Sequence, residues 1–352
     1  MKPKYQIVRQ PAPSWVGPLL PILAVLVTFI ITGIFLLMSH ANPLEAIYYI
    51  MVSPLTSRVS ALEVLVKATP LLLTGAAVTI AFASGYYNIG AEGQLYAGAM
   101  AAAWLGMIMG NLPPVLAIPL MLLGGFAAGM LWALIPALLK VKLSVDEVVT
   151  TLLMNSIIMF IVSAMLNGPW RDPASGWPQS AEIAASTELP RLFAGSRLHL
   201  GFIVALVMIA LVWFILSRTS LGLRMRAVGL GKDAAKFMGV NVPRTTFITA
   251  LLSGGIAGLA GVTEVAGIHF HLIDAISNGF GYTGIIAATL GGLNPIGSGV
   301  AAIFLGLIDT GSQSVSRAMG VSTYLGDVVQ AVLLLVMLAV FLLKNYQIRR
   351  VE

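Results

Sequence analysis

The chain has 352 residues, no cysteine and very few charged side chains. The absence of cysteine excludes disulfide bonds, thiolate metal sites and a cysteine nucleophile. Charged residues make up 10% of the sequence, whereas a soluble domain carries about 25%. A basic soluble face for nucleic acid is therefore not available, and we expect no nucleic-acid partner.

Apolar residues dominate instead, at 58% of the sequence. Several apolar runs reach the roughly 20 residues that a helix needs to cross a bilayer. They predict an all-α, polytopic helical bundle of about ten transmembrane segments, forming a single domain over residues 1–352. The expected spans are 19–38, 61–83, 89–109, 114–138, 147–166, 199–217, 246–264, 281–294, 296–314 and 325–343. The short, glycine-rich span at 281–294 is expected to be broken or re-entrant, and eight full spans plus two partial ones would fit nearly as well.

Lysine and arginine gather on one side of these spans. Residues 1–18, 139–146, 218–245 and 344–352 carry three, two, six and three of the 20 basic residues, whereas the long loop 167–198 is neutral. The positive-inside rule then predicts that both termini are cytoplasmic and that this long loop is extracytoplasmic. The chain is expected to be a multi-pass protein of a bacterial cell (inner) membrane, surrounded by lipid. Paired Trp-Pro elements in the long loop predict an interfacial helix or plug, or a docking surface for an external partner.

A polar segment that contains glycine separates two apolar runs, at Asn88-Ile89-Gly90-Ala91-Glu92-Gly93-Gln94. Lipid offers no partner for a carboxylate or for backbone groups freed by a break, so this segment must be buried in protein or line a polar path. Asn88 is expected to cap the next helix, with Glu92 in its first turn and Gln94 projecting to another face. Either Glu92 bonds freed backbone amides and only stabilises a broken helix, or the polar edges of the break line a solute pathway.

A second interruption, Gly291-Gly292-Leu293-Asn294-Pro295, lies in the other half of the chain. Paired interruptions in two halves of a membrane protein point to a central pathway. A path with amide and hydroxyl groups and few charges suits a neutral polar molecule, such as a nucleoside or a sugar. The candidate pathway residues are Asn88, Glu92, Gln94, Thr283 and Asn294.

The loop 218–245 contains a short amphipathic segment bounded by glycines. Ala234, Ala235, Phe237 and Met238 offer an apolar surface there. A short helix of this kind either lies in a groove of a partner protein or rests on anionic lipid. The residue pattern alone leaves both interpretations open.

Several segments resemble the permease subunits of ATP-binding cassette importers, in the branched-chain amino acid and ribose permease superfamily, and they follow one another in the same order as in that family. The resemblance covers about residues 60–310. Its motifs are Thr69-Pro70-Leu71-Leu72-Leu73-Thr74-Gly75, Phe82-Ala83-Ser84-Gly85, the 88–94 segment, Arg226-Ala227-Val228-Gly229, the glycine-rich run Ser253–Gly261, and Gly281-Tyr282-Thr283-Gly284-Ile285. The form of the 88–94 segment is similar to the nucleoside-type branch, and the outer loop and length resemble the longer of its two paired permeases.

This resemblance implies a transport subunit with no catalytic or metal site and no cofactor of its own. ATP and Mg would bind to separate ATPase subunits, beside a second homologous permease and an extracytoplasmic solute-binding protein. The nearest approach to a phosphate-binding loop, Gly231-Lys232-Asp233, lacks both the first glycine and the hydroxyl residue of that motif. The implied ATPase-coupling residues are Arg226, Gly229, Asp233, Ala234, Ala235 and Gly239.

Two other classes remain open from the residues. An ion-coupled secondary transporter would need no ATPase, and Glu92 or Asp309 would carry protons. An intramembrane enzyme acting on a lipid-linked substrate would need paired acids or a metal site on the inner face. Asp146 and Glu147 are adjacent, but consecutive helical positions point in different directions and make a poor pair.

Overall fold

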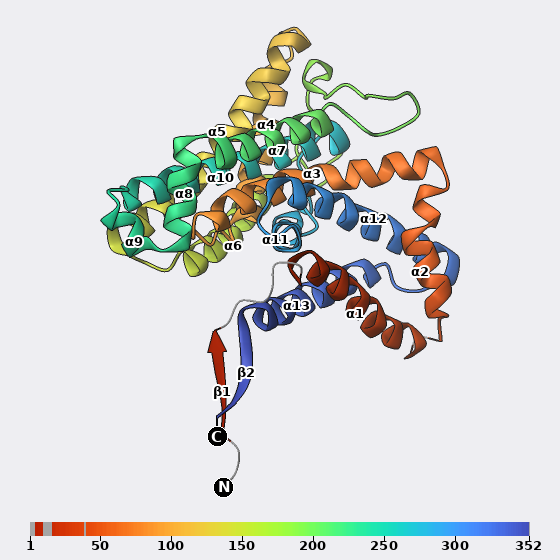
Figure 1. The fold of residues 1–352 in the computed structure, drawn as a ribbon. Helices are drawn as coiled ribbons and strands as arrows, with labels where there is room; N and C mark the ends of the chain where they lie inside the picture. The colour runs from red at the N-terminus through yellow and green to blue at the C-terminus, as the bar shows by residue number, and fades with distance from the viewer. Residues whose placement is uncertain (1–3, 10–15, 39, 352) are drawn as a thin grey trace. The chain divides into compact units, whose positions relative to one another are not determined.

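The structure is a computed structural model that describes residues 4–9, 16–38 and 40–351 (Figure 1). It is almost entirely helical, as the apolar runs predict. The exception is a two-stranded antiparallel ribbon in which β1 (Lys4–Arg9) pairs with β2 (Tyr346–Val351). The ribbon at the two ends of the described chain was not expected, whereas the predicted all-α, polytopic bundle is confirmed.

The chain divides into two compact units, one of residues 1–57 and 307–352 and one of residues 58–306. The first unit contains the ribbon, α1 (Val16–Met38), α2 (Pro43–Met51), the 3-10 turn η1 (Ser53–Leu55) and α13 (Leu325–Asn345). Helix α12 (Pro295–Met319) begins in the second unit and ends in the first. Within the first unit α1 packs against α13.

The second unit holds most of the predicted motifs. Its elements are α3 (Arg58–Ala83), α4 (Ala91–Ile108), α5 (Pro114–Leu143), α6 (Glu147–Asn167), the 3-10 turn η2 (Ala185–Thr187), α7 (Gly201–Arg218), α8 (Ser220–Leu230), α9 (Lys232–Phe237), α10 (Val242–Glu264), the π-helical turn η3 (Val265–His269) and α11 (Phe280–Leu290). Helices α3 and α10 are buried along most of their length, whereas α5, α6 and α7 expose most of theirs.

Each of the ten expected spans falls on a helix. Within the described residues, seven helices are long and apolar enough to cross a bilayer, and two shorter apolar helices accompany them. Helix α11 has only 11 residues, or about 16 Å at 1.5 Å per residue, which is half of a span. The prediction of a broken element in the 281–294 region is therefore confirmed.

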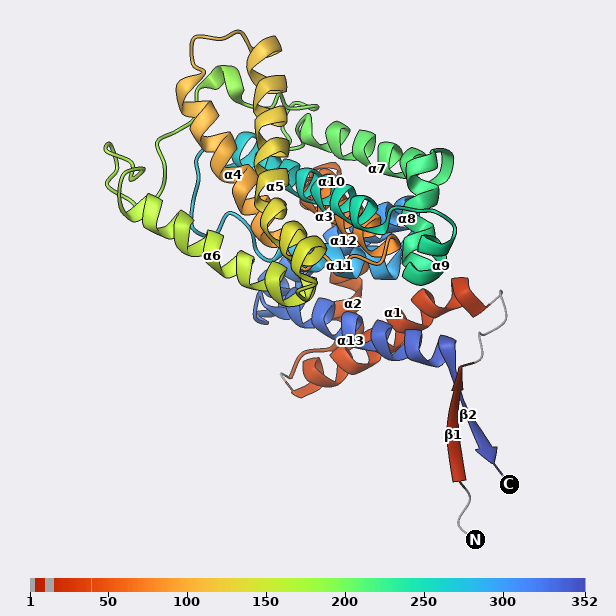
Figure 2. The ribbon, with the colours of Figure 1, turned by 90° about the vertical axis from the view of Figure 1, so that its left-hand side faces the viewer.

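Small residues let α4, α5 and α10 pack backbone against backbone (Figure 2). A Cβ atom on Gly98 of α4 would lie 2.0 Å from the carbonyl oxygen of Gly258 in α10. On Gly129 of α5 it would lie 2.2 Å from the carbonyl oxygen of Gly254. Glycine allows this approach because it has no side chain. The glycine-rich run of the sequence is thus the middle of a tight three-helix seam.

The long loop between α6 and α7 lies over η3 and the residues that follow it. The amide of Ile183 donates to the carbonyl oxygen of Phe270, and the amide of Leu189 donates to that of Ala266, both at 2.8 Å. The segment from Pro169 to Pro178 forms turns and bends. This segment does not form the expected interfacial helix, because its amides make turn-type bonds within the loop, such as that of Asp172 to the carbonyl oxygen of Gln179 at 2.8 Å and that of Gly176 to the carbonyl oxygen of Asp172 at 2.9 Å.

Candidate functional site

The side chain of Glu92 links α4 to α11. It lies in the first turn of α4 and is only 2% exposed. Its Oε2 accepts a 2.6 Å hydrogen bond from the amide of Gly281, the second residue of α11. The first amides of a helix have no partner within it and favour a nearby negative charge. The predicted burial is confirmed, and Glu92 bonds an otherwise unpaired amide of α11.

Asn88 and Gln94 face each other across the break between α3 and α4. Asn88 Nδ2 donates to Gln94 Oε1 and to Ser253 Oγ, each at 2.9 Å, and Gln94 Nε2 donates back to Asn88 Oδ1 at 3.2 Å. Ser253 Oγ in turn donates to the carbonyl oxygen of Ala77 at 2.6 Å. Gln94 therefore projects to another face of α4 than Glu92, which bonds α11, as expected. The amide pair ties α3, α4 and α10 together.

Asn88 was predicted to cap α4, but it lies two residues before the N-cap position. The N-cap residue of α4 is Gly90, which has no side chain to offer. Asn88 Oδ1 accepts from the amide of Gly90 at 2.9 Å, which is an Asx-type turn before the helix. Asn88 thus shapes the approach to α4 rather than capping its first turn.

Two side chains of α6, which the sequence analysis did not single out, complete the break. Asn155 Oδ1 accepts from the amide of Gly93 at 2.8 Å, and Asn155 Nδ2 donates to the carbonyl oxygen of Ile89 at 3.0 Å. Thr151 Oγ1 accepts from the amide of Ile89 at 3.2 Å. These side chains are four residues apart and so share one face of α6. A polar pair at this spacing in an apolar span was the signal that could have found them.

The remaining two predicted pathway residues lie elsewhere. Thr283 is half-buried on α11. Asn294 is exposed, and its Oδ1 accepts from the amides of Ile296 and Gly297 at 3.0 and 3.2 Å. Asn294 is therefore the cap of α12. The structure brings Asn88, Glu92 and Gln94 together with α6 and α10 in one buried network, and it does not bring Asn294 to them.

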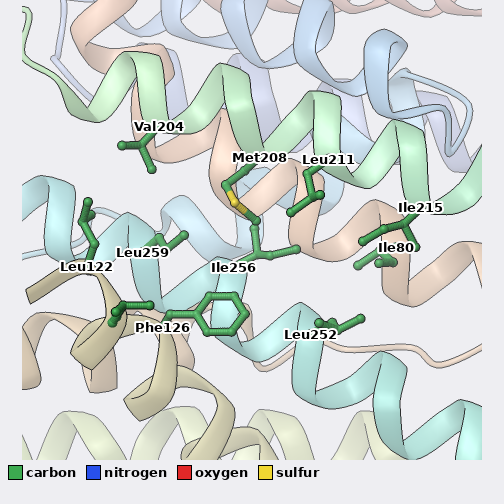
Figure 3. A pocket seen from close by; sticks show the side chains of 11 residues that line it. Ile80, Leu122, Phe126, Val204, Met208, Leu211, Ile215, Leu252, Ile256 and Leu259 are labelled. Atoms are coloured by element: carbon green, nitrogen blue, oxygen red, sulfur yellow. The ribbon is translucent and has the colours of Figure 1, made fainter. Parts of the chain in front are cut away.

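A separate cavity of about 290 Å³ lies among α3, α5, α7 and α10 (Figure 3). Every side chain that lines it is apolar, and Figure 3 shows the ring of Phe126 and the side chains of Met208 and Ile256 turned toward the same space. An apolar cavity offers no group to orient a polar solute, so it is suited to hydrocarbon. The lining residues are Ile80, Leu122, Leu123, Phe126, Val204, Met208, Leu211, Ile215, Leu252, Ile256 and Leu259.

The loop 218–245 contains two helices, and the second is the short helix that was expected between glycines. Helix α8 ends at Leu230, and α9 begins at Lys232 and lasts six residues. Gly239 follows with a φ of +81°, in the left-handed region that favours glycine. Gly229, near the end of α8, lies against the last residue of α3, since a Cβ on it would be 2.2 Å from the carbonyl oxygen of Ala83.

The exposed apolar side chains of this segment differ in part from those expected. Phe237 and Leu230 are 93% and 92% exposed, and Met238 is also exposed. Ala235 is fully buried instead, so its side chain is not on the free surface that the sequence analysis assigned to it. A groove of about 420 Å³ runs beside these side chains. Its lining residues are Leu223, Arg226, Ala227, Leu230, Gly231, Ala234 and Met238.

The two adjacent acids of the enzyme hypothesis both have partners. Asp146 Oδ1 accepts from the amides of Val148 and Val149 at 2.8 and 3.1 Å and so caps α6. Glu147 forms an ion pair with Lys140 of α5. In the part of the chain that the structure describes, no three His, Asp or Glu side chains come close enough together to hold a metal ion.

Comparison with known proteins assigns the chain to a family. The family described as "Branched-chain amino acid transport system / permease component" matches residues 60–338. The chain belongs to this permease family. It is a membrane-embedded transport subunit of an ATP-binding cassette transporter, and the resemblance drawn from its motifs is confirmed.

Three relatives of this permease show how far the similarity extends. The glucose ABC transporter permease protein TsgB13 of Haloferax volcanii is 33% identical, over 97% of this chain and 92% of its own length. The guanosine ABC transporter permease protein NupP of Bacillus subtilis is 35% identical over 82% of each chain. The nucleoside ABC transporter permease protein NupB of Lactococcus lactis is 29% identical over 85% of each chain.

Proposed function

We propose that this permease is the longer transmembrane subunit of an ATP-driven importer for nucleosides. The observation that carries the proposal is its similarity, along most of its length, to two permeases named for guanosine and for nucleosides. Glucose is the competing solute, because the relative that covers most of the chain is named for it. Both solutes are uncharged and hydroxylated, which agrees with a bundle that carries few charges.

The proposed orientation follows from the basic residues. Residues 1–18, 139–146, 218–245 (which include α8 and α9) and 344–352 lie in the cytoplasm, because together they carry 14 of the 20 lysine and arginine residues. The neutral loop 168–200 lies outside, where a solute-binding protein would deliver its cargo. The membrane would be a bacterial cell membrane.

Energy would come from a separate ATPase that binds ATP and Mg, while this chain binds no cofactor. Leu223, Leu230, Phe237 and Met238 are all exposed on α8 and α9 or directly after them. A group of exposed apolar side chains marks a contact surface for a protein, which here would be the ATPase. The coupling surface would include Arg226, Gly229, Asp233, Ala234 and Gly239, with Ala235 supporting it from beneath.

A second permease would complete the path. Bacillus subtilis has two guanosine ABC transporter permease proteins, NupP and NupQ, which are 35% and 31% identical to this chain. Lactococcus lactis likewise has the nucleoside permease proteins NupB and NupC. These pairs support a heterodimer of two related permeases.

Reconstitution in liposomes tests this function. The permease with its ATPase, partner permease and binding protein should take up guanosine toward the ATPase side, and uptake should stop when hydrolysis is blocked. A tenfold preference for glucose over guanosine would show that glucose is the solute, and the assignment as an ATP-driven importer would stand. Uptake by this chain alone, driven by a proton or sodium gradient, would overturn the importer and support secondary transport.

A further inference from the structure

A row of polar side chains, open to the surroundings, lies beside the buried network of Glu92. It consists of Tyr282 of α11, Asp274 and Asn278 of the segment before it, and Ser163 and Asn167 of α6, and is called here the polar strip. Tyr282 is 40% exposed, and the side chains of Asp274, Asn278 and Asn167 are exposed as well.

The polar strip extends from near the middle of α6 to its C-terminal end. The hydroxyl of Tyr282 accepts a 3.1 Å hydrogen bond from Asn155, the ninth of the 21 residues of α6. Ser163, whose hydroxyl donates to Asp274 Oδ2 at 3.2 Å, lies eight residues further along, or about 12 Å at 1.5 Å per residue. Under the proposed orientation, this is the outer half of the membrane.

Lipid cannot be the neighbour of the polar strip. A carboxylate and two amide side chains at this depth find no hydrogen-bond partner in hydrocarbon, so such side chains face protein or a water-filled path. Ile157 and Phe160, earlier along α6, are exposed and apolar and suit lipid, and Phe160 shares the face of Ser163 three residues further on. The exposed surface of α6 therefore changes from apolar to polar toward its C-terminal end, and the polar end is the part that faces protein or water.

Buried groups hold the polar strip in place. Tyr96 of α4 donates from its hydroxyl to the carbonyl oxygen of Asp274 at 3.0 Å, and Glu92 fixes the start of α11 one residue before Tyr282. Gly279 makes the turn between them, with a φ of +82° that favours glycine. A fixed set of polar and aromatic groups binds with a smaller loss of conformational entropy than a mobile one.

We propose that the polar strip is the solute-contacting wall of the translocation path. The ring of Tyr282 provides a flat face for a nucleobase, because every base has a π-face that stacks on an aromatic ring. The carboxylate of Asp274 accepts from sugar hydroxyls and repels phosphate. The ligand class is an uncharged molecule with a flat ring and hydroxyl groups, which is a nucleoside rather than a nucleotide. This inference rests on the proposed function for its solute.

Cysteine accessibility tests the location without relying on transport. The chain has no native cysteine, so Asn278→Cys and Ser163→Cys introduce single thiols into the polar strip. In the assembled complex, a membrane-impermeant, water-soluble thiol reagent added from outside should label both, and guanosine should protect them at least threefold. Phe214→Cys, an exposed position on the apolar helix α7, is the matched control and should stay unlabelled. The proposal would be overturned if either strip position stays unlabelled.

Transport by the same complex tests the role of the ring. Tyr282→Ala should reduce guanosine uptake at least tenfold, whereas Tyr282→Phe should stay within about threefold because it keeps the stacking face. Wild-type uptake by assembled Tyr282→Ala would overturn the assignment, and loss of the partner permease from that variant would show a subunit interface instead. If glucose protects the thiols and guanosine does not, the polar strip still contacts the solute, but the solute is not a nucleoside.

Discussion

The backbone of Gly229 in α8 lies directly against the carbonyl group of Ala83 at the end of α3. A Cβ atom at Gly229 would be 2.2 Å from that oxygen, and the amide of Gly85 would be 3.2 Å away. The segment proposed to bind the ATPase therefore contacts the chain at the point where α3 gives way to the polar break. A shift of α8 would reach the residues around Asn88 without passing through a flexible linker.

Gly229→Ala should separate ATP hydrolysis from transport. The added methyl group would collide with a backbone oxygen, which cannot rotate away as a side chain can, so α8 must move from α3. We expect uptake per ATP hydrolysed to fall at least fivefold in proteoliposomes. Gly231→Ala is the matched control, since its backbone is extended and an added Cβ would meet only Ala234 Cβ at 3.8 Å. Equal coupling in both variants would contradict a mechanical role for the contact.

Replacing Glu92 should affect stability through α11. Glu92→Ala leaves the buried amide of Gly281 without its acceptor, which costs about 1–3 kcal/mol for such a group. Glu92→Gln retains a carbonyl oxygen and should lose less. The thermal unfolding midpoint in detergent measures both. Glu182→Gln on the exposed loop provides the control. A wild-type midpoint for Glu92→Ala would show that the hydrogen bond is not needed.

The coupling surface can be tested without disturbing the fold. Phe237→Asp places a charge on a side chain that is 93% exposed, so insertion and stability should be unchanged. Copurification of the ATPase should fall at least tenfold, because the charge would be desolvated in the contact. Leu143→Asp, at an exposed position near the end of α5, should bind the ATPase normally. Ala235→Arg is a poorer test, since that buried side chain would disrupt α9 itself.

Asn155 should be needed for the break to fold. Asn155→Leu removes the partners of the Gly93 amide and the Ile89 carbonyl, and each unsatisfied buried group costs about 1–3 kcal/mol. The expected result is a lower unfolding midpoint and loss of guanosine uptake. Ser156→Leu, at the exposed position next along α6, should be tolerated. Similar unfolding midpoints for the two variants would remove Asn155 from the structural network.

Features that depend on local sequence were predictable, and features that depend on how elements face each other were not. Apolar runs predicted the helices, and the cost of a carboxylate in lipid predicted the burial of Glu92. The acceptor role of Glu92 toward Gly281 joins residues 189 positions apart, which no local pattern specifies. Ala235 and Phe237 are both apolar, and hydrophobicity alone would favour burial of the larger Phe237, so the packing of α9 decides which one is buried.

The glycine seam of α4, α5 and α10 restricts how this protein can change shape. Interdigitated side chains can change rotamer when two helices move past each other, but backbones in direct contact cannot. Sliding of α10 would bring Gly258 into collision with Gly98 or Gly129. The three helices therefore travel as one block during a transport cycle. Any hinge must then lie in the segments outside this block.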